Sequence, residues 1–308
     1  MSQNPKETDL YFVLNGHEQY VKGNPDESLL DYLRSIGLKS VKSGCGGEGD
    51  CGMCTILLNN KPVQSCLIKL SSVSGKSVET LESLGTADNL HPLQEAFIET
   101  GAIQCGFCTP AQLLTAKSLL KQKPNPTESE IRKALSGVLC RCTGYVRIVD
   151  AVLRASAMMR GEKLPPYSPP EIKFENDISE IEFPSEYYRK NGNKSPLLPL
   201  VLTPKGMQQL HQVGKPIKKV DGVKLALGKP VFTDDVQPAE MLHGVLLTSP
   251  HAHAIIKKID VSKAKAIPGV HAVLTHLDVP RIKYATGGQS FPQPLPHDQS
   301  SLDYKVRH

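Results

Sequence analysis

Eight cysteines are the residues of this 308-residue chain that are best suited to carry chemistry. They form two groups of four, which are Cys45, Cys51, Cys54 and Cys66, and then Cys105, Cys108, Cys140 and Cys142. In a reducing compartment, grouped thiols bind metal or do redox chemistry more often than they form disulfides. Two groups of four therefore predict two four-thiolate sites with no cysteine left over.

The first group lies mostly on one loop, Ser43 to Cys54, which reads SGCGGEGDCGMC. Its spacing is C-x5-C-x2-C with a fourth cysteine twelve positions on, one residue longer than the plant-type ferredoxin loop that holds a [2Fe-2S] cluster. Glycines allow such a loop to bend sharply and to direct backbone N–H groups at sulfur. A zinc knuckle is the alternative, but zinc sites usually pair their ligands as two short C-x2-C units. The spacing thus favours an iron–sulfur cluster.

The second group consists of two short pairs, Cys105/Cys108 before an expected helix and Cys140/Cys142 after another. Four thiolates would then converge between helix ends, where helix N-termini and loop amides offset negative charge. Zinc held by four thiolates is an open alternative at this second site. The single residue between Cys140 and Cys142 is short for a zinc knuckle, and the ferredoxin-like neighbour also favours iron. Two adjacent clusters would transfer electrons one at a time from one to the other.

The elements that must position the first group form a small α+β unit ending near Gly85. The expected elements are strands at 10–14, 17–21, 55–58 and 63–68 and a helix at 29–33. Asn15-Gly16 is a dipeptide typical of a two-residue hairpin turn.

Around the second group the apolar period becomes helical, roughly from residue 89 to residue 160. Pro92 and Thr109-Pro110 suit helix starts, Thr127–Glu130 is a capping box, and a fourth helix runs through 148–153. A compact four-helix unit is expected.

The rest of the chain differs in composition. Residues 161–212 are rich in proline and charge and are expected to form an extended linker or disordered chain. From Val213 a mixed unit follows, with buried strands expected at Val245–Leu247 and Val270–Leu274 and a short helix at Ser262–Ile267. It reaches His308 with no evident closing element, so we expect this unit to be incomplete.

Composition excludes some classes of function. The net charge of +5 is spread out, with no basic stripe and interleaved aromatics, so nucleic acid is not an expected partner. No apolar run is long enough to span a bilayer, and the first residues lack the pattern of a signal peptide. A cytoplasmic location is therefore expected, with no membrane partner.

The motifs CGGEGDCGMC, QCGFCTP and LCRCTGY resemble the signature pair of the molybdenum hydroxylases, the xanthine dehydrogenase and aldehyde oxidoreductase family. This resemblance covers about residues 10–160. It resumes in VGKPIKKVDGVKLALGKPVFTDD and in LLTSPHAHAIIKKIDVSKAKAIPGVHAVLTHLDVP, which resemble the opening of the family's molybdenum-cofactor subunit.

The resemblance implies a domain order. It implies a β-grasp, plant-ferredoxin-like [2Fe-2S] domain at 8–85, a helical [2Fe-2S] domain at 86–160, the linker at 161–212, and an incomplete α/β hammerhead-like part of the molybdenum-cofactor domain at 213–308. It also implies that the helical cluster lies nearest the molybdenum and that the β-grasp cluster passes electrons onward. Gln104 and Cys142 are implied to touch the molybdopterin cofactor.

The implied activity is hydroxylation of a carbon of a purine or another N-heterocycle, with an aldehyde oxidoreductase of the same family as the alternative. No catalytic residue is expected in this chain, since the family's molybdenum-side residues lie beyond its last residue. A molybdenum-cofactor-binding subunit or a missing C-terminal part is expected to supply them. No flavin domain precedes the molybdenum unit, so FAD is expected only on a separate subunit, with a ferredoxin- or flavodoxin-type acceptor as another partner. A non-catalytic, zinc-binding assembly fragment and a degenerate pseudo-subunit are the other hypotheses.

Overall fold

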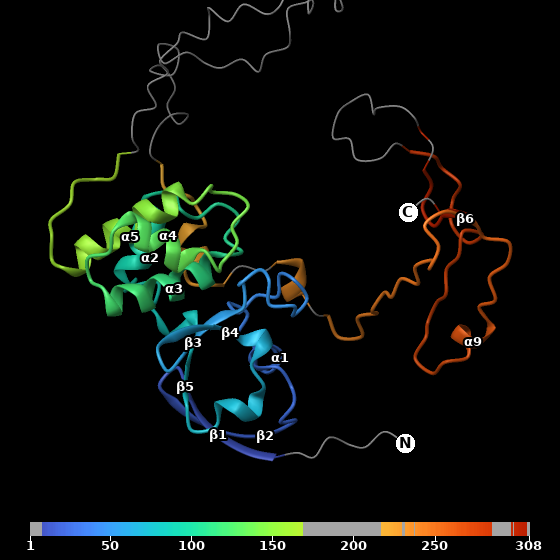
Figure 1. The fold of residues 1–308 in the computed structure, drawn as a ribbon, viewed down its shortest axis with the longest axis horizontal. Helices are drawn as coiled ribbons and strands as arrows, with labels where there is room; N and C mark the ends of the chain where they lie inside the picture. Colours follow the sequence, from blue (N-terminus) through green and yellow to red (C-terminus); the bar gives the residue numbers. More distant parts are fainter. Residues whose placement is uncertain are drawn as a thin grey trace, which may run out of the picture. The chain divides into compact units, whose positions relative to one another are not determined.

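The computed structural model describes residues 8–168, 217–229, 232–236, 238–284, 297 and 299–306 (Figure 1). The chain forms two compact units, Met1–Gln237 and Pro238–His308. The expected α+β class is confirmed, since helices and a sheet both contribute to the first unit. The predicted linker lies outside the described residues from Pro169 onward.

A five-stranded sheet makes up one part of the first unit. Its strands are β1 (Thr8–Leu14), β2 (His17–Gly23), β3 (Thr55–Leu58), β4 (Lys61–Gln64) and β5 (Ser77–Glu79), in the order β2-β1-β5-β3-β4. The predicted Asn15-Gly16 turn joins β1 to β2, and both of its residues have positive φ. The sequence did not predict β5, whose three residues are too few to show a strand pattern, although β5 pairs with both β1 and β3.

The helix α1 (Leu29–Ser35) packs on this sheet and completes its core. Ser28 caps the helix by accepting a hydrogen bond from the Asp31 backbone N–H, and the chain leaves it through Gly37, at positive φ. Leu29 and Leu33 are buried in the same core as Phe12 of β1. The first cysteine loop therefore follows a helix that is packed in the core of the sheet.

Four helices form the second part of the first unit, as predicted (Figure 1). They are α2 (Pro92–Glu99), α3 (Thr109–Gln122), α4 (Glu128–Leu135) and α5 (Val146–Met159). His91 and Thr127 each begin a capping box, which fixes where α2 and α4 start. Among the described residues, no helix has both the length and the apolar character needed to span a bilayer.

The helix α3 also contacts the sheet, which joins the two parts of the first unit. Ser118 Oγ donates to the Asn60 carbonyl at 2.9 Å, and Lys121 Nζ donates to Asn60 Oδ1 at 2.7 Å. Lys117 of the same helix forms an ion pair with Glu79 of β5. The two cysteine loops are therefore held at a fixed separation.

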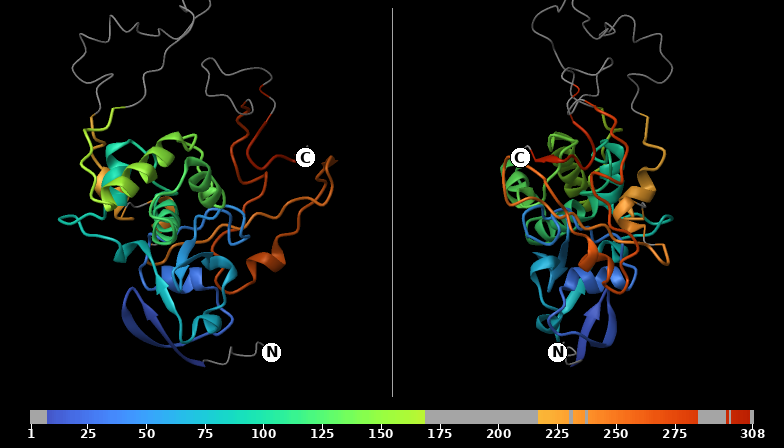
Figure 2. Two further views of the ribbon diagram at one scale, coloured as in Figure 1. Left: turned by 60° about the vertical axis from the view of Figure 1, so that its left-hand side comes forward. Right: turned by 90° about the vertical axis from the view of Figure 1, so that its right-hand side faces the viewer.

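The chain returns to the first unit after the linker. We call residues Ile217–Lys229 and Phe232–Val236 the returning segment; it contains α8 (Gly222–Ala226) and the turn η5 (Thr233–Asp235). The light-orange α8 lies beside the helices in both views of Figure 2, and Leu225 and Ala226 are buried in the helical core. The boundary in packing thus lies at Gln237–Pro238, later than the predicted start of the third domain at Val213.

The second unit, Pro238–His308, has little regular structure among its described residues. It contains β6 (Ala254–Ile255) paired with β7 (Lys305–Val306), and α9 (Ser262–Lys265), which confirms the predicted short helix. The prediction of buried strands at Val245–Leu247 and Val270–Leu274 was wrong. Val245, Leu246 and Leu247 are 92%, 81% and 100% exposed, because no described strand pairs with them or covers them.

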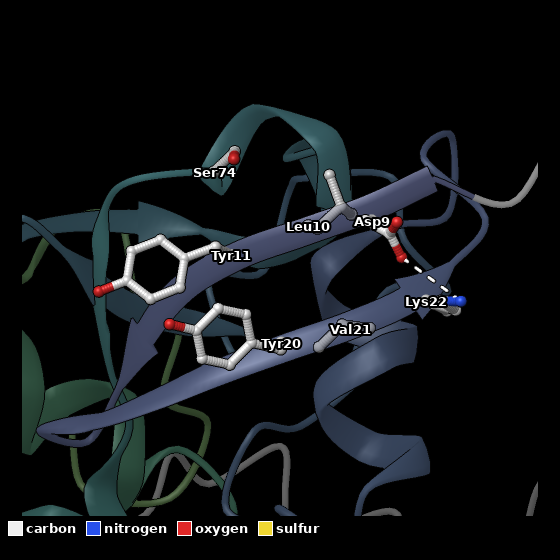
Figure 3. A pocket seen from close by; sticks show the side chains of 7 residues that line it. All are labelled: Asp9, Leu10, Tyr11, Tyr20, Val21, Lys22 and Ser74. Atoms are coloured by element: carbon white, nitrogen blue, oxygen red, sulfur yellow. Dashed lines mark ion pairs between the residues drawn. The ribbon is translucent and has the colours of Figure 1, made fainter.

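A surface hollow lies on the β1–β2 hairpin, and it contains no thiol. Figure 3 shows the rings of Tyr11 and Tyr20 side by side, with their centroids 5.1 Å apart, and the exposed ion pair of Asp9 with Lys22 farther along the strands. Both pairs are directly opposite in the antiparallel register. Such cross-strand pairs stabilise a hairpin. The residues that line this hollow therefore have a structural role in the hairpin.

Candidate metal centres

The four thiols of the first group gather into two pairs. The Cys51 thiol lies close enough to Cys45 to affect its pKa, and the Cys54 thiol lies close enough to Cys66 to affect its pKa. Cys45 also lies close enough to Cys66 to affect its charge, which brings the two pairs together. All eight cysteines of the chain are free thiols, so none of these contacts is a disulfide.

The backbone of the first loop turns its N–H groups toward sulfur, as its glycines predict. The N–H groups of Cys51 and Asp50 donate to the Cys45 sulfur and lower the pKa of this thiol to about 6. The N–H of Met53 lies 3.5 Å from Cys51 Sγ. A side chain at Gly44 would place its Cβ 2.9 Å from the same sulfur. Glycine is therefore needed there for the backbone to approach the ligand atom.

Burial has the opposite effect on two other thiols of this group. It raises the pKa of Cys51, and together with the Cys54 thiol it raises the pKa of Cys66 to about 12. Thiolate is the form of cysteine that binds metal. A bound cation would supply the compensating charge that these buried sulfurs lack, so metal binding would release protons here.

The second group has the same arrangement. The Cys140 thiol lies close enough to Cys108 to affect its pKa, and the Cys105 thiol lies close enough to Cys142 to affect its pKa. Burial raises the pKa of Cys108. Burial is the largest single effect on Cys140 and acts to raise its pKa. The Thr143 hydroxyl, whose Oγ1 lies 3.1 Å from the sulfur, acts together with the Thr143 and Cys142 backbone N–H groups and the Cys108 thiol, and their combined effect lowers this pKa.

The loop that carries Cys140 and Cys142 is held by one tyrosine. Tyr145 has φ of 67°, a conformation that non-glycine residues seldom adopt. Its hydroxyl accepts a hydrogen bond from the Cys140 backbone N–H at 2.8 Å and donates to the Val138 carbonyl at 3.2 Å. Its own N–H donates to Thr143 Oγ1 at 3.1 Å. These three hydrogen bonds hold the tight turn LCRCTGY.

The pairing of thiols distinguishes a cluster from a single ion. Among the described residues, no three Cys, His, Asp or Glu side chains converge closely enough to hold one metal ion. A [2Fe-2S] cluster instead has two irons with two thiolates each. Two nearby pairs of thiols per site are compatible with that requirement.

The two cysteine loops touch each other through their backbones. The Leu139 N–H donates to the Cys51 carbonyl at 3.0 Å, which links a residue of the first quartet to the neighbour of Cys140. Met53 packs against the buried cluster of Cys108, Ala111 and Val138 beside this contact. An added Cβ on Gly52 would lie 1.9 Å from the Gly137 carbonyl oxygen, so the two backbones are in direct contact there. A backbone hydrogen bond, from Leu139 to Cys51, therefore links the two cysteine loops.

One side of the second quartet is open to solvent. Gln104, Cys105 and Cys142 are exposed, whereas Cys108 is buried. The side chain of Arg141 also faces solvent. The second quartet therefore has a buried side toward the first quartet and an open side that another group can approach.

The sequence analysis missed a charged cluster beside these loops. Lys42, three residues before Cys45, is fully buried and forms an ion pair with Asp235, which also pairs with Arg34 at 3.2 Å. No local pattern could reveal this contact, since 193 residues separate Lys42 from Asp235.

Two adjacent domains with paired thiol quartets define a protein with two [2Fe-2S]-binding domains. Family models support this class: residues 12–81 match the 2Fe-2S iron-sulfur cluster binding domain, and residues 80–153 match the [2Fe-2S] binding domain. Residues 227–305 match the aldehyde oxidase and xanthine dehydrogenase a/b hammerhead domain.

Known relatives agree with these matches. The chain is 46% identical over 140 residues to the nicotinate dehydrogenase small FeS subunit of Eubacterium barkeri, covering 45% of this chain and 88% of that protein. It is 32% identical over 299 residues to the probable hypoxanthine oxidase XdhD of Escherichia coli, covering 97% of this chain and 28% of XdhD. The crystal structure of the aldehyde oxidoreductase from Desulfovibrio desulfuricans matches with a TM-score of 0.70 and 37% identity, over 92% of this chain and 28% of that chain.

The chain belongs to the molybdenum hydroxylase family of xanthine dehydrogenases and aldehyde oxidoreductases. It spans only about 28% of the length of XdhD and of the aldehyde oxidoreductase.

Proposed function

We propose that this chain is the iron–sulfur electron-transfer part of a molybdenum hydroxylase. In this proposal the first part of the chain is a β-grasp domain, the four helices are the family's helical domain, and the second unit belongs to a hammerhead domain. Cys45, Cys51, Cys54 and Cys66 hold the first cluster, and Cys105, Cys108, Cys140 and Cys142 hold the second. The paired thiols of each quartet are the observation that carries the proposal.

Bound [2Fe-2S] clusters supply one-electron redox chemistry, with potentials set by hydrogen bonds to sulfur, net charge and solvent exposure. The residues of this chain place the two sites on either side of the Cys51–Leu139 hydrogen bond. Thr143 and the loop N–H groups stabilise negative charge on sulfur. The buried Cys108 and the packed Met53 exclude water from the path between the quartets.

We assign the open side of the second quartet to the molybdopterin cofactor. Gln104 and Cys142, both exposed, are the residues that would contact it. A partner chain, or residues beyond His308, would supply the rest of the molybdenum site, and FAD would come from a separate subunit. The Eubacterium relative is named as a small FeS subunit, which supports the proposal that the iron–sulfur clusters and the molybdenum site lie on separate chains. A cytoplasmic location is part of this proposal, since thiols stay reduced there.

Absorption spectroscopy and metal analysis test the cluster assignment. We expect the purified protein to be red-brown and to contain about four irons per chain, as two four-cysteine [2Fe-2S] sites require. Dithionite should bleach the visible absorption and produce two distinct electron paramagnetic resonance (EPR) signals. A colourless protein that contains zinc and no iron would instead support the assembly-fragment hypothesis.

The substrate class divides into two candidates. The match to the probable hypoxanthine oxidase XdhD favours a purine, and the 37% identity to a solved aldehyde oxidoreductase favours an aldehyde. We favour the purine because the XdhD match extends over 97% of this chain. In the complete enzyme, anaerobic addition of hypoxanthine should then bleach the cluster absorption. Bleaching by benzaldehyde and not by hypoxanthine would reverse the choice.

A further inference from the structure

The returning segment contacts the second cysteine loop and the residues just before the first one, although it follows both loops by more than seventy residues in the sequence. On the helical side, Gln94 Nε2 donates to the Ala226 carbonyl at 2.9 Å in a buried contact. Leu225 lies over the Cys105–Cys108 loop, since an added Cβ on Gly106 would come within 2.5 Å of Leu225 Cδ2. The segment thus covers the backbone between two proposed cluster ligands.

A buried charge network anchors the other end of the segment to the first domain. Asp235 pairs with Lys42 and with Arg34, and the side chains of Lys42 and Asp235 are 0% and 3% exposed. Arg34 also binds the Asp234 carboxylate at 2.9 Å and the Val41 carbonyl at 2.8 Å. Buried charges persist only when they are paired and hydrogen-bonded. The position of the segment is therefore fixed by these partners.

One aromatic ring lies between the anchor and the second loop. The ring centroid of Phe232 is 4.7 Å from Lys42 Nζ. The same ring packs edge-to-face on Phe107, with centroids 5.1 Å apart and planes at 84°. Phe107 stands between Cys105 and Cys108, and Lys42 stands three residues before Cys45. A chain of three contacting side chains therefore joins Lys42, directly before the first cysteine loop, to the second loop.

We infer that Phe232 is a positioning residue for the second cluster, held in place by Asp235 through its pairs with the first domain. This inference rests on the proposed function. The ring of Phe232 packs on Phe107 and limits the access of water to the buried Cys108 side of the loop, while Cys105 remains exposed. An all-thiolate cluster gains negative charge on reduction, so water stabilises its reduced form, and solvent exposure is one determinant of cluster potential. Loss of the cover should therefore raise the midpoint potential of the second cluster.

Redox titration of the holo-protein, followed by EPR, tests this inference. We expect Phe232→Ala to raise the midpoint potential of the second cluster. At a fixed applied potential, the ratio of reduced to oxidised second cluster should rise on the order of tenfold, which corresponds to about 59 mV for a one-electron couple. The first cluster should keep its potential. Phe232→Tyr, which retains the ring, should restore the original value. Val236→Ala, in the same segment but with an exposed side chain, is the matched control and should change neither cluster.

Asp235→Asn tests whether the anchor positions the ring. The Asp235 carboxylate pairs with Lys42 and Arg34 and also accepts a hydrogen bond from the Phe232 backbone N–H at 3.2 Å, so we expect this variant to shift the potential of the second cluster in the same direction as Phe232→Ala. If Phe232→Ala does not fold, Phe232→Leu keeps an apolar cover and should give a smaller rise. Unchanged second-cluster potentials in both Phe232→Leu and Asp235→Asn would overturn the inference. Absence of a second EPR signal in the unaltered protein would overturn the proposed function as well.

Discussion

Cys51→Ser should remove the first cluster and leave the second cluster intact. The hydroxyl oxygen of serine does not replace the soft thiolate that iron–sulfur clusters require, and Cys51 is a buried member of its quartet. We expect the iron content to fall from about four to about two per chain, with loss of one of the two EPR signals. Metal analysis and EPR of the reduced protein measure both effects.

The reciprocal variant is the control for this prediction. Cys140→Ser removes a thiol of the other quartet, so it should abolish the second signal and keep the first. The backbone hydrogen bond from Leu139 to the Cys51 carbonyl does not involve either sulfur and should persist in both variants. The assignment of two independent quartets would be wrong if either substitution removed all of the iron or left both signals unchanged.

Gly52→Ala should disrupt the junction between the two cysteine loops. Its Cβ would lie 1.9 Å from the Gly137 carbonyl oxygen, a backbone atom that no side-chain rotation can move away. The two domains must then separate locally, which breaks the adjacent hydrogen bond between Leu139 and Cys51. We expect lower iron content, a lower unfolding temperature by circular dichroism, and loss of magnetic coupling between the two reduced clusters.

Gly46→Ala is a matched control, because it isolates the cost of backbone conformation. Gly46 and Gly52 have similar positive φ values, 72° and 69°, but an added Cβ on Gly46 meets no atom within 4 Å. The left-handed conformation costs an alanine about 1–2 kcal/mol, and both variants bear this cost. Gly46→Ala should therefore lose about that amount of stability and keep both clusters. Equal effects in the two variants would mean that the junction contact contributes nothing.

Much of the fold could be predicted because its signals are local. Asn15-Gly16 marks a turn, Thr127–Glu130 marks a helix start, and the apolar period of α2–α5 marks four helices. The two groups of cysteines were also evident from spacing, since three thiols of the first group share one loop and the second group consists of two short pairs. The structure pairs their thiols, and the role of each cysteine as a ligand remains a prediction for the variants above.

The parts that could not be predicted depend on distant contacts. The strand β5 has three residues and is defined by its two neighbours rather than by its own pattern. Val245–Leu247 has the composition of a buried strand, but no described strand pairs with it. The pair of Lys42 with Asp235 spans 193 residues, and nothing near either residue in the sequence indicates the other.

The burial of Leu225 and Ala226 has a consequence for how this family's modules can be recombined. The sequence match to the helical domain ends at residue 153, but its hydrophobic core includes residues that come after a long connection. A gene fragment cut at the end of that match would leave a hole where these two side chains belong. An exchange of electron-transfer modules between relatives should therefore carry Ile217–Val236 along with the cysteine-bearing domains, even when the connection itself is replaced.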